Sequence, residues 1–194
     1  MNYEQIDSHL ARCASFNQQE LEIFHSRLKH RTFKKRTILL RQGEICRFEA
    51  YILKGCVKKY YIDLDGSEVI LQFAVEDWWI SNIGSFYDQK PSNLFIETLE
   101  DTELLMIDYE SKERLFTEIP YLERVFRLMV QRSYSVLESR FYATLAHSAE
   151  ERYLDFLKKY PEIPHRVPQT QIAAYLGITP ESLGRIKTSL LKKK

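Results

Sequence analysis

The spacing of hydrophobic residues changes twice along the chain, from helical to strand-like and back to helical. In the first 30 residues apolar side chains recur at helical intervals, and Asn17 with Glu20 matches a capping box, which predicts a helix start. From about Thr32 the apolar runs are short, rich in Ile, Val, Leu, Phe and Tyr, and separated by turn residues, as strands are. The pair Asp65-Gly66 between two such runs predicts a hairpin. We therefore expect the middle of the chain to form a compact antiparallel sandwich or barrel-like domain.

Helical spacing returns after Asp108. It predicts a short helix over 110–119, a long helix over 121–146 and a third helix that starts at a capping box at Ser148. In the long helix, apolar or small residues recur every seven positions at Leu122, Met129, Val136 and Ala143. This pattern fits either a core helix that lies on the sheet domain or a helix that also pairs with a second copy of the chain, and we favour the second.

The sharpest local signal lies between Gln169 and Leu190, where two short helical patterns flank a tight turn. Gly177 stands where the chain must turn, Thr179 suits an N-cap and Pro180 suits the first position of the following helix. The apolar positions of the two helices are Ile172, Ala173, Leu176, Leu183 and Ile186. This is the spacing of a helix-turn-helix, whose second helix can enter the DNA major groove. A helical hairpin without a role in DNA binding is the alternative.

Whole-chain composition at first argues against a nucleic-acid partner, because 28 Lys and Arg face 27 Asp and Glu and the formal net charge is +1. The charge is unevenly distributed, however. Residues 1–119 carry 15 basic and 20 acidic side chains, a net of −5, whereas residues 120–194 carry 13 and 7, a net of +6. The basic part contains the helix-turn-helix pattern, which favours an anionic partner for it. The 44% of hydrophobic residues excludes wholesale disorder.

Polar residues stand where a DNA-reading helix would use them. On the second helix, the residues predicted to reach base edges are Glu181, Ser182, Arg185 and Thr188. Gln169 and Thr170 lie at the start of the first helix, where side chains and backbone N–H groups can bind a phosphate. Salt-dependent attraction to the DNA backbone is expected from Lys187, Lys192, Lys193 and Lys194.

Other functional classes find little support in the sequence. No nucleophile elbow, metalloprotease motif, phosphate loop or dinucleotide fingerprint is present, so we expect no enzyme, no catalytic residues, no metal and no cofactor. Asp63 and Asp65 resemble the start of a calcium loop, but the distal Glu of such a loop is missing. Three cysteines without a C-x-x-C pair, no signal peptide and no membrane-length apolar run favour a reduced, cytoplasmic location.

The stretch from Pro180 to Arg185 reads P-E-S-L-G-R. It is similar to the recognition-helix motif R-E-T-V-x-R of the bacterial Crp/Fnr-type transcription regulators, with Glu181, Ser182 and Arg185 at the Glu, Thr and second Arg. Pro180 replaces the first Arg, which removes one expected DNA contact. A looser similarity, to the glycine framework of the β-roll in these proteins, lies in Gly43, Gly55, Gly66 and Glu68. The resemblance covers nearly the full length of the chain.

The resemblance implies an α+β protein with three parts. These are an N-terminal cyclic-nucleotide-binding-like antiparallel β-roll with flanking helices over 1–119, a long dimerisation helix over 120–147, and a winged-helix-like helix-turn-helix domain over 148–194. The wing of this last domain is expected to be absent after Leu191.

The function that the resemblance implies is that of a transcription regulator that binds double-stranded DNA as a homodimer. Two recognition helices related by a two-fold axis contact half-sites about one helical turn apart, so the operator is expected to be an inverted repeat. RNA polymerase is a further implied partner. The alternative is a small-ligand sensor or protein-interaction module that does not read DNA sequence.

The ligand pocket departs from the family pattern. Members that bind cyclic AMP carry a Gly-Glu pair and then an Arg-Ser/Thr-Ala run, whose Arg holds the cyclic phosphate. Here Ser81-Asn82 and Ser92-Asn93 stand at those positions, and Trp79 is a further candidate lining residue. Loss of the Arg removes a charge-assisted contact of about 1.5–3 kcal/mol. We therefore expect no response to cyclic AMP, and an effector that is either absent or another small molecule.

Overall fold

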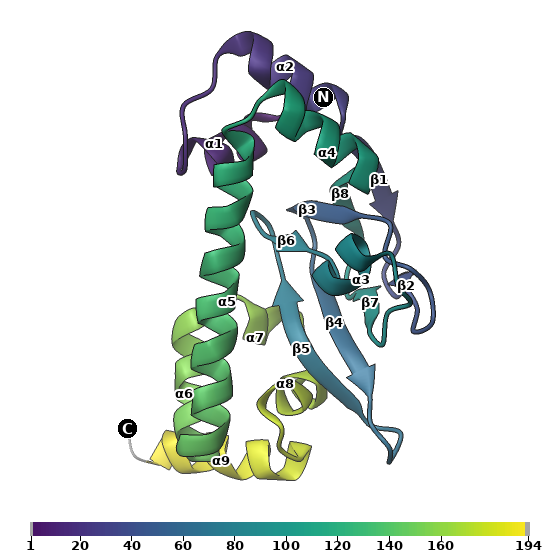
Figure 1. Cartoon of the computed structure of the whole chain (residues 1–194). Helices are drawn as coiled ribbons and strands as arrows, with labels where there is room; N and C mark the ends of the chain where they lie inside the picture. The colour runs from purple at the N-terminus through teal and green to yellow at the C-terminus, as the bar shows by residue number, and fades with distance from the viewer. Residues whose placement is uncertain (1, 193–194) are drawn as a thin grey trace.

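The computed structural model describes residues 2–192, in which a long helix joins a sheet domain to a helical C-terminal unit (Figure 1). The strands are β1 (Lys29–Phe33), β2 (Ile38–Leu40), β3 (Glu49–Lys54), β4 (Val57–Ile62), β5 (Glu68–Ala74), β6 (Trp79–Ile80), β7 (Phe95–Thr98) and β8 (Thr102–Ile107). The helices are α1 (Glu4–Ala11), α2 (Gln18–Ser26), α3 (Ile83–Asp88), α4 (Tyr109–Glu118), α5 (Leu122–Ala146), α6 (Ala149–Lys159), α7 (Ile163–Arg166), α8 (Gln169–Leu176) and α9 (Pro180–Lys192). The strands with α1–α4 form the sheet domain, α5 runs beside it as a rod, and α6–α9 form the C-terminal unit.

The sheet domain contains two four-stranded antiparallel sheets, with strand orders β1-β8-β3-β6 and β2-β7-β4-β5. Fully buried side chains from both sheets form a common core, which includes Ile52, Val57, Ile96 and Leu104. The predicted antiparallel domain is therefore confirmed. The pattern did not predict β1 or β6, because β1 is a sheet edge with mostly exposed polar residues and β6 has only two residues.

The turn between β3 and β4 requires glycine at Gly55. Its φ is +106°, a conformation that L side chains rarely adopt. A Cβ at this position would also lie 2.5 Å from Oγ1 of Thr102 and 2.9 Å from the carbonyl oxygen of Asp101. The hairpin predicted at Asp65-Gly66 is confirmed, since it joins the paired strands β4 and β5.

The N-terminal helices and α4 pack with the first turns of α5 on one side of the sheets. Their shared core includes the fully buried Ile6, Phe24, Leu115 and Val125. The capping box at Asn17 is confirmed for α2. These contacts anchor the upper end of α5, whereas every residue of α5 from 131 to 139 is exposed.

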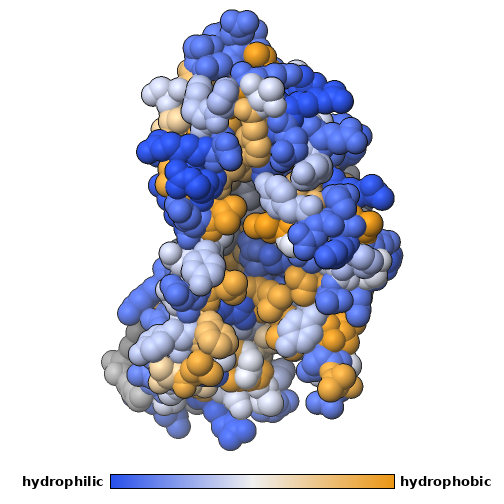
Figure 2. Space-filling model, in the orientation of Figure 1, coloured by the Kyte–Doolittle hydropathy of each residue, from blue (hydrophilic) through white to orange (hydrophobic). Residues whose placement is uncertain are grey.

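The seven-residue pattern predicted for the long helix does not form one continuous surface. Leu122 is buried in the core and Met129 packs against it, whereas Val136 is 40% exposed. Exposed apolar residues instead recur every three or four positions along one side of the helix. We call them the apolar stripe, and its members are Val130, Tyr134, Leu137, Phe141 and Leu145. Figure 2 shows apolar side chains over the lower half of α5, below a largely polar upper end.

The core of the C-terminal unit continues into the sheet domain. Its buried side chains include Phe156, Ile163, Ile172, Ala173, Leu176 and Leu183. Phe73 of β5 belongs to the same cluster, and its ring stacks on Tyr175 of α8 with centroids 5.4 Å apart. Next to them, the rings of Trp78 and Tyr160 lie 5.5 Å apart. The two units therefore share one hydrophobic core.

Local signals in the C-terminal unit agree with the structure in most places. The capping box at Ser148 is confirmed for α6, which ends just before Pro161. The residues that follow contain the short helix α7, which the sequence pattern did not predict. Pro164 stands in the first turn of α7, where its missing N–H costs nothing.

Candidate nucleic-acid interface

The segment from α8 to α9 has the geometry of a helix-turn-helix. α8 ends at Gly177 in the left-handed conformation, with φ +67° and ψ +39°. The N–H of Ile178 then donates to the carbonyl of Ala173, with 3.1 Å between the atoms. Thr179 caps α9, because its Oγ1 accepts the backbone N–H of Ser182 at 3.2 Å. Ala173 is fully buried, and so small a side chain lets the two helices approach closely.

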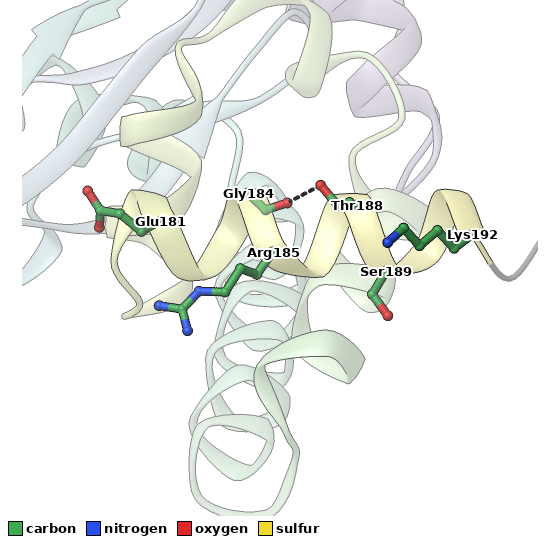
Figure 3. A pocket seen from close by; sticks show the side chains of 6 residues that line it. All are labelled: Glu181, Gly184, Arg185, Thr188, Ser189 and Lys192. Atoms are coloured by element: carbon green, nitrogen blue, oxygen red, sulfur yellow. Dashed lines mark hydrogen bonds between the residues drawn. The ribbon is translucent and has the colours of Figure 1, made fainter.

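The outer side of α9 is a shallow groove that is open to solvent (Figure 3). Its lining residues are Glu181, Gly184, Arg185, Thr188, Ser189 and Lys192. The side chain of Arg185 extends away from the helix, and within residues 2–192 it makes no ion pair. The hydroxyl of Thr188 donates to the carbonyl of Gly184 at 3.0 Å. The guanidinium of Arg185 is therefore free to bind an external acceptor.

Glu181 places a carboxylate in the first turn of α9. Hydrogen bonds from its own backbone N–H and from the side chain of Thr179 hold the pKa of Glu181 below its usual value, with Arg185 contributing from four residues away. The side chain is fully exposed to solvent and remains ionised at neutral pH. A carboxylate and a guanidinium thus stand one turn apart on the same open face.

Two of the predicted contact residues are less available. Ser182 is half-buried, and its hydroxyl accepts a hydrogen bond from Oγ1 of Thr179 at 3.1 Å. Lys187 is also half-buried and lies two positions from Arg185, which is about 200° around the helix. The structure therefore brings Glu181 and Arg185 together on the open face but not Lys187.

The remaining predicted contact residues lie at the ends of the two helices. Gln169 and Thr170 are exposed in the first turn of α8, and Lys192 is exposed at the end of α9. Lys193 and Lys194 lie outside the described residues. Ser189 lines the groove but was not predicted, although its spacing of four from Arg185 would have indicated it.

Arg140 of α5 fastens the C-terminal unit to the sheet domain. Its guanidinium donates to the backbone carbonyls of Leu71 and Ile70 on β5, the latter at 2.8 Å. It also donates to the carbonyl of Tyr175 at 2.6 Å and lies 3.9 Å from the centre of that ring. One side chain therefore joins α5, β5 and α8. No sequence pattern indicated this role, because the acceptors are backbone atoms 35 to 70 positions away.

Arg166 of α7 makes a second attachment between the two units. It donates two hydrogen bonds to Glu76, at 2.7 and 3.0 Å, and two to Glu100, at 2.7 and 3.1 Å. Glu76 also accepts the N–H of Gly55 at 2.7 Å. Partial burial raises the pKa of Glu76, but the hydrogen bonds outweigh this effect and hold the pKa below its usual value. Arg140 and Arg166 thus attach the C-terminal unit to the sheet domain at two separate places, and together they fix the orientation of α9 relative to the sheets.

Comparisons with known proteins agree with this architecture. Residues 30–118 match the cyclic nucleotide-binding domain family. The chain is 23% identical over 176 residues to the cAMP-activated global transcriptional regulator CRP of Salmonella typhimurium (strain LT2), which covers 86% of this chain and 84% of that relative. The c-di-GMP-responsive global regulator CLP of Xanthomonas campestris has a TM-score of 0.72 at 21% identity, covering 91% of this chain and 93% of that one. The chain is therefore similar in sequence to a CRP regulator and shares the fold of CLP.

A second solved structure supports the same fold. FixK2 from Bradyrhizobium japonicum has a TM-score of 0.74 at 18% identity, covering 86% of this chain and 85% of that chain. Within residues 2–192 no three His, Cys, Asp or Glu side chains are grouped to hold a metal ion. In the same range, no helix is both long and apolar enough to cross a bilayer.

The effector-pocket candidates of this chain are only partly assembled. Asn82 donates from Nδ2 to Oγ of Ser92 at 2.7 Å, and Oγ of Ser81 donates to the carbonyl of Phe48 at 2.9 Å. Asn93 is exposed and makes no hydrogen bond with these residues within the described part of the chain. The ring of Trp79 packs elsewhere, against Phe126 of α5 and Tyr51 of β3, each with centroids 5.5 Å away. Three of the five candidates therefore lie in one neighbourhood.

Lys59 of β4 belongs to the same neighbourhood and was not predicted. Its Nζ donates to the carbonyl of Ser81 at 3.0 Å, and burial lowers the pKa of Lys59 to about 8. The adjacent Lys58 instead pairs with Glu68 and Glu97, at 2.5 and 3.3 Å. The pairing of β4 with β5 changes register between Lys59 and Tyr60. The alternation of side chains along a regular strand therefore could not predict which face of the sheet each lysine occupies.

Proposed function

We propose that this protein is a DNA-binding transcription regulator that acts as a homodimer on an inverted-repeat operator. The observation that carries the proposal is the open outer face of α9, where Glu181 and Arg185 stand one turn apart on a firmly seated helix-turn-helix. In this proposal residues 1–119 act as the sensor, 120–147 as the dimerisation helix and 148–194 as the DNA-binding domain.

The proposed readout follows from the chemistry of the open face. Arg185 can donate two hydrogen bonds to O6 and N7 of guanine, and Glu181 can accept from the amino group of cytosine. Each such contact discriminates against a wrong base by about 1–3 kcal/mol. Gln169, Thr170 and Lys192, all exposed, are proposed to contact phosphates, which sets the register of the helix in the groove. Ser182 and Lys187 have secondary roles because both are half-buried.

The apolar stripe supports the homodimer. Tyr134, Phe141 and Leu145 are 64%, 65% and 73% exposed, although they are large and hydrophobic. Contiguous apolar surface of this kind marks interaction sites, and spacing by three and four positions is that of paired helices. A second copy of α5 is the natural partner, because a two-fold axis then buries the stripe on both chains at once. The same axis presents two α9 helices to DNA half-sites.

The sensor is proposed not to respond to cyclic AMP. The Asn82 amide and the Ser92 hydroxyl hydrogen-bond each other, so neither replaces the Arg of the cyclic-AMP-binding pattern. Lys59 supplies a positive charge nearby, but an ammonium is a point charge and lacks the planar fork with which Arg binds a phosphate. A regulator on promoter DNA also meets RNA polymerase, which is the further proposed partner.

The deciding experiment is selection of bound DNA from a genomic library with the purified full-length protein, followed by titration of the selected sites at several salt concentrations. We expect an inverted repeat and an affinity that falls steeply with salt. Arg185→Ala should weaken the selected site about 10- to 100-fold and relax one base position. Arg31→Ala, an exposed arginine on β1, is the matched control and should leave binding unchanged.

The same experiment separates the alternative function. If no sequence is enriched and binding does not depend on salt, the chain is a ligand sensor or an interaction module and does not read DNA. If Arg185→Ala binds selected and random DNA as well as the wild type does, the role assigned to Arg185 is wrong.

A further inference from the structure

A second cavity lies where α5, α6 and α8 meet, away from the open face of α9. Its volume is about 240 Å³, below the range of about 300–1,000 Å³ that is typical of drug-sized ligands. α5 contributes Arg140 to its wall, α6 contributes Arg152, Lys159 and Tyr160, and α8 contributes Tyr175. This cavity, which we call the junction pocket, is therefore lined by the long helix α5 and by two helices of the C-terminal unit, α6 and α8.

The junction pocket has an excess of positive charge. Arg140, Arg152 and Lys159 all line it, and none of the three is paired with a carboxylate within residues 2–192. Asp155 also lines the pocket, but it is exposed and lies 3.5 Å from Nδ1 of His147. One acid therefore faces three cations. Arg140 is held by backbone carbonyls and by the Tyr175 ring, and Lys159 lies 5.4 Å from the centre of the Tyr160 ring. The net positive charge beside the cavity nevertheless favours a ligand that brings negative charge.

One donor in the junction pocket is also left without an acceptor. Within residues 2–192, the buried Nε of Arg152 has no hydrogen-bond partner, while the Nη1 group of the same side chain donates to the carbonyl of His147 at 2.9 Å. A buried guanidinium donor without an acceptor is costly. Burial, and then the charge of Arg140, lower the pKa of Lys159, which indicates that the cations repel each other there. A bound anion would accept a hydrogen bond from Nε of Arg152 and would reduce the repulsion between Arg140 and Lys159.

The lining of the junction pocket also includes aromatic side chains. Tyr160 lies 5.3 Å from Phe156 and 6.0 Å from Tyr175, measured between ring centroids, and both neighbours line the pocket. Ring faces of this kind prefer an aromatic partner in a stacked or edge-to-face arrangement. The volume suits a single ring with one small substituent, whereas a nucleotide is larger than the space.

We propose that the junction pocket binds a small aromatic carboxylate. Its carboxylate is placed against Arg152 and Lys159, and its ring lies against Tyr160. A carboxylate fits better than a neutral group because it accepts from the unpaired Nε of Arg152 and neutralises the charge of Lys159. The binding step does not depend on the proposed function, because it involves neither α9 nor DNA.

The proposed dimer covers at most one edge of the junction pocket. Successive residues of a helix are rotated by about 100°, so Ser139 and Ala143, which line the pocket, each lie about 160° around α5 from Phe141 of the apolar stripe. Thr144 also lines the pocket and lies only about 20° from Leu137 of the stripe. A second copy that covers the stripe therefore reaches the pocket at Thr144 and leaves the side of Ser139 and Ala143 open. The ligand would instead hold α6 and α8 against α5.

The test is calorimetric titration of the full-length protein with sodium benzoate, and with neutral benzamide as the matched ligand. We expect saturable binding of benzoate with a dissociation constant in the millimolar range or tighter, and binding of benzamide at least tenfold weaker. Lys159→Gln should weaken benzoate binding about tenfold. Lys158→Gln changes the neighbouring exposed lysine, which does not line the pocket, and should bind like the wild type.

A second variant tests the location without removing a charge. Ala143→Leu places a larger side chain in the wall of the pocket and should abolish benzoate binding, while the melting temperature shows that the variant is folded. The proposal is overturned if benzoate does not bind saturably at up to about 20 mM, or if benzamide binds equally well. It is also overturned if Lys159→Gln and Ala143→Leu both bind benzoate like the wild type.

Discussion

Replacing Arg166 with Gln should weaken the attachment of the C-terminal unit to the sheet domain. The change removes four charge-assisted hydrogen bonds, of 2.7 to 3.1 Å, to Glu76 and Glu100. Hydrogen bonds to charged groups contribute about 1.5–3 kcal/mol each. The side chains of Glu76 and Glu100 are 38% and 31% exposed, however, so solvent screens both pairs strongly. We therefore expect the free energy of unfolding to fall by about 2–3 kcal/mol in total.

Urea unfolding at pH 7 measures this loss, with tryptophan fluorescence as the signal. Trp78 is a suitable reporter because it packs against Tyr160 at the junction of the two units. For a chain of this length the same loss corresponds to about 4–12 °C in melting temperature. Arg31→Gln is the control, since Arg31 is exposed on β1 and, among the residues that the structure describes, donates only to the carbonyl of its neighbour His30.

The effect of Arg166→Gln should also depend on pH. The pKa of Glu76 is lower in the folded protein than its usual value of 4.5. Ionised Glu76 therefore stabilises the fold above the unfolded pKa, and this contribution is lost as the pH falls through the folded pKa. The difference between wild type and variant should be largest above about pH 5 and smaller in acid. A difference below about 0.5 kcal/mol at pH 7, or one that is constant down to about pH 3, would refute the reasoning.

Three further outcomes are expected. Phe141→Glu puts a charge in the apolar stripe and should give a monomer at about 10 µM by light scattering, where the wild type is expected to be a dimer; a dimeric variant would contradict the stripe as the interface. Gly55→Ala should lower the free energy of unfolding in urea by about 2–4 kcal/mol, because the new Cβ would clash with Thr102 and Asp101. Gly43→Ala should lower it by only about 1 kcal/mol, since no described atom lies within 4 Å of a Cβ at Gly43. Equal losses for the two variants would show that the clash at Gly55 does not contribute. Calorimetry with cyclic AMP should show no binding, and a micromolar affinity would overturn the interpretation of the degenerate pocket.

The helix-turn-helix could be predicted because its determinants are local. Gly177, Thr179 and Pro180 each suit one backbone position, and the structure places all three as their chemistry requires. The capping boxes at Asn17 and Ser148 were found for the same reason. Such signals involve only three or four neighbouring residues, so they can be recognised in a single sequence.

The surface of α5 could not be predicted in the same way. Two apolar patterns overlap on this helix, one through Leu122 and Met129 and the other through Val130, Leu137 and Phe141. Only contacts with the sheet domain decide which pattern is buried, and these contacts come from the N-terminal helices, from the strands and from α4. Sequence spacing alone therefore predicted the seven-residue pattern as the pairing surface, although its first residues are buried in the core of the sheet domain.

The charged residues that fix the C-terminal unit were missed for a related reason. Arg140 binds backbone carbonyls, and Arg166 binds acids 66 and 90 positions away. Lys59 lies 22 positions before Ser81 in the sequence. The pairing of β4 with β5 also changes register directly after Lys59. None of these partners shares a helix face or a strand pair with the residue that binds it, so no periodicity connects them.

The ring stack between Phe73 of β5 and Tyr175 of α8 makes the two units of this chain poor candidates for exchange between relatives. A chimaera that takes α6–α9 from another protein must also bring a matching residue on β5. Otherwise it buries a mismatched side chain or opens a void, which costs about 2–5 kcal/mol. A substitution at Phe73 is therefore expected to require a matching change at Tyr175, so the two units are coupled through their shared core.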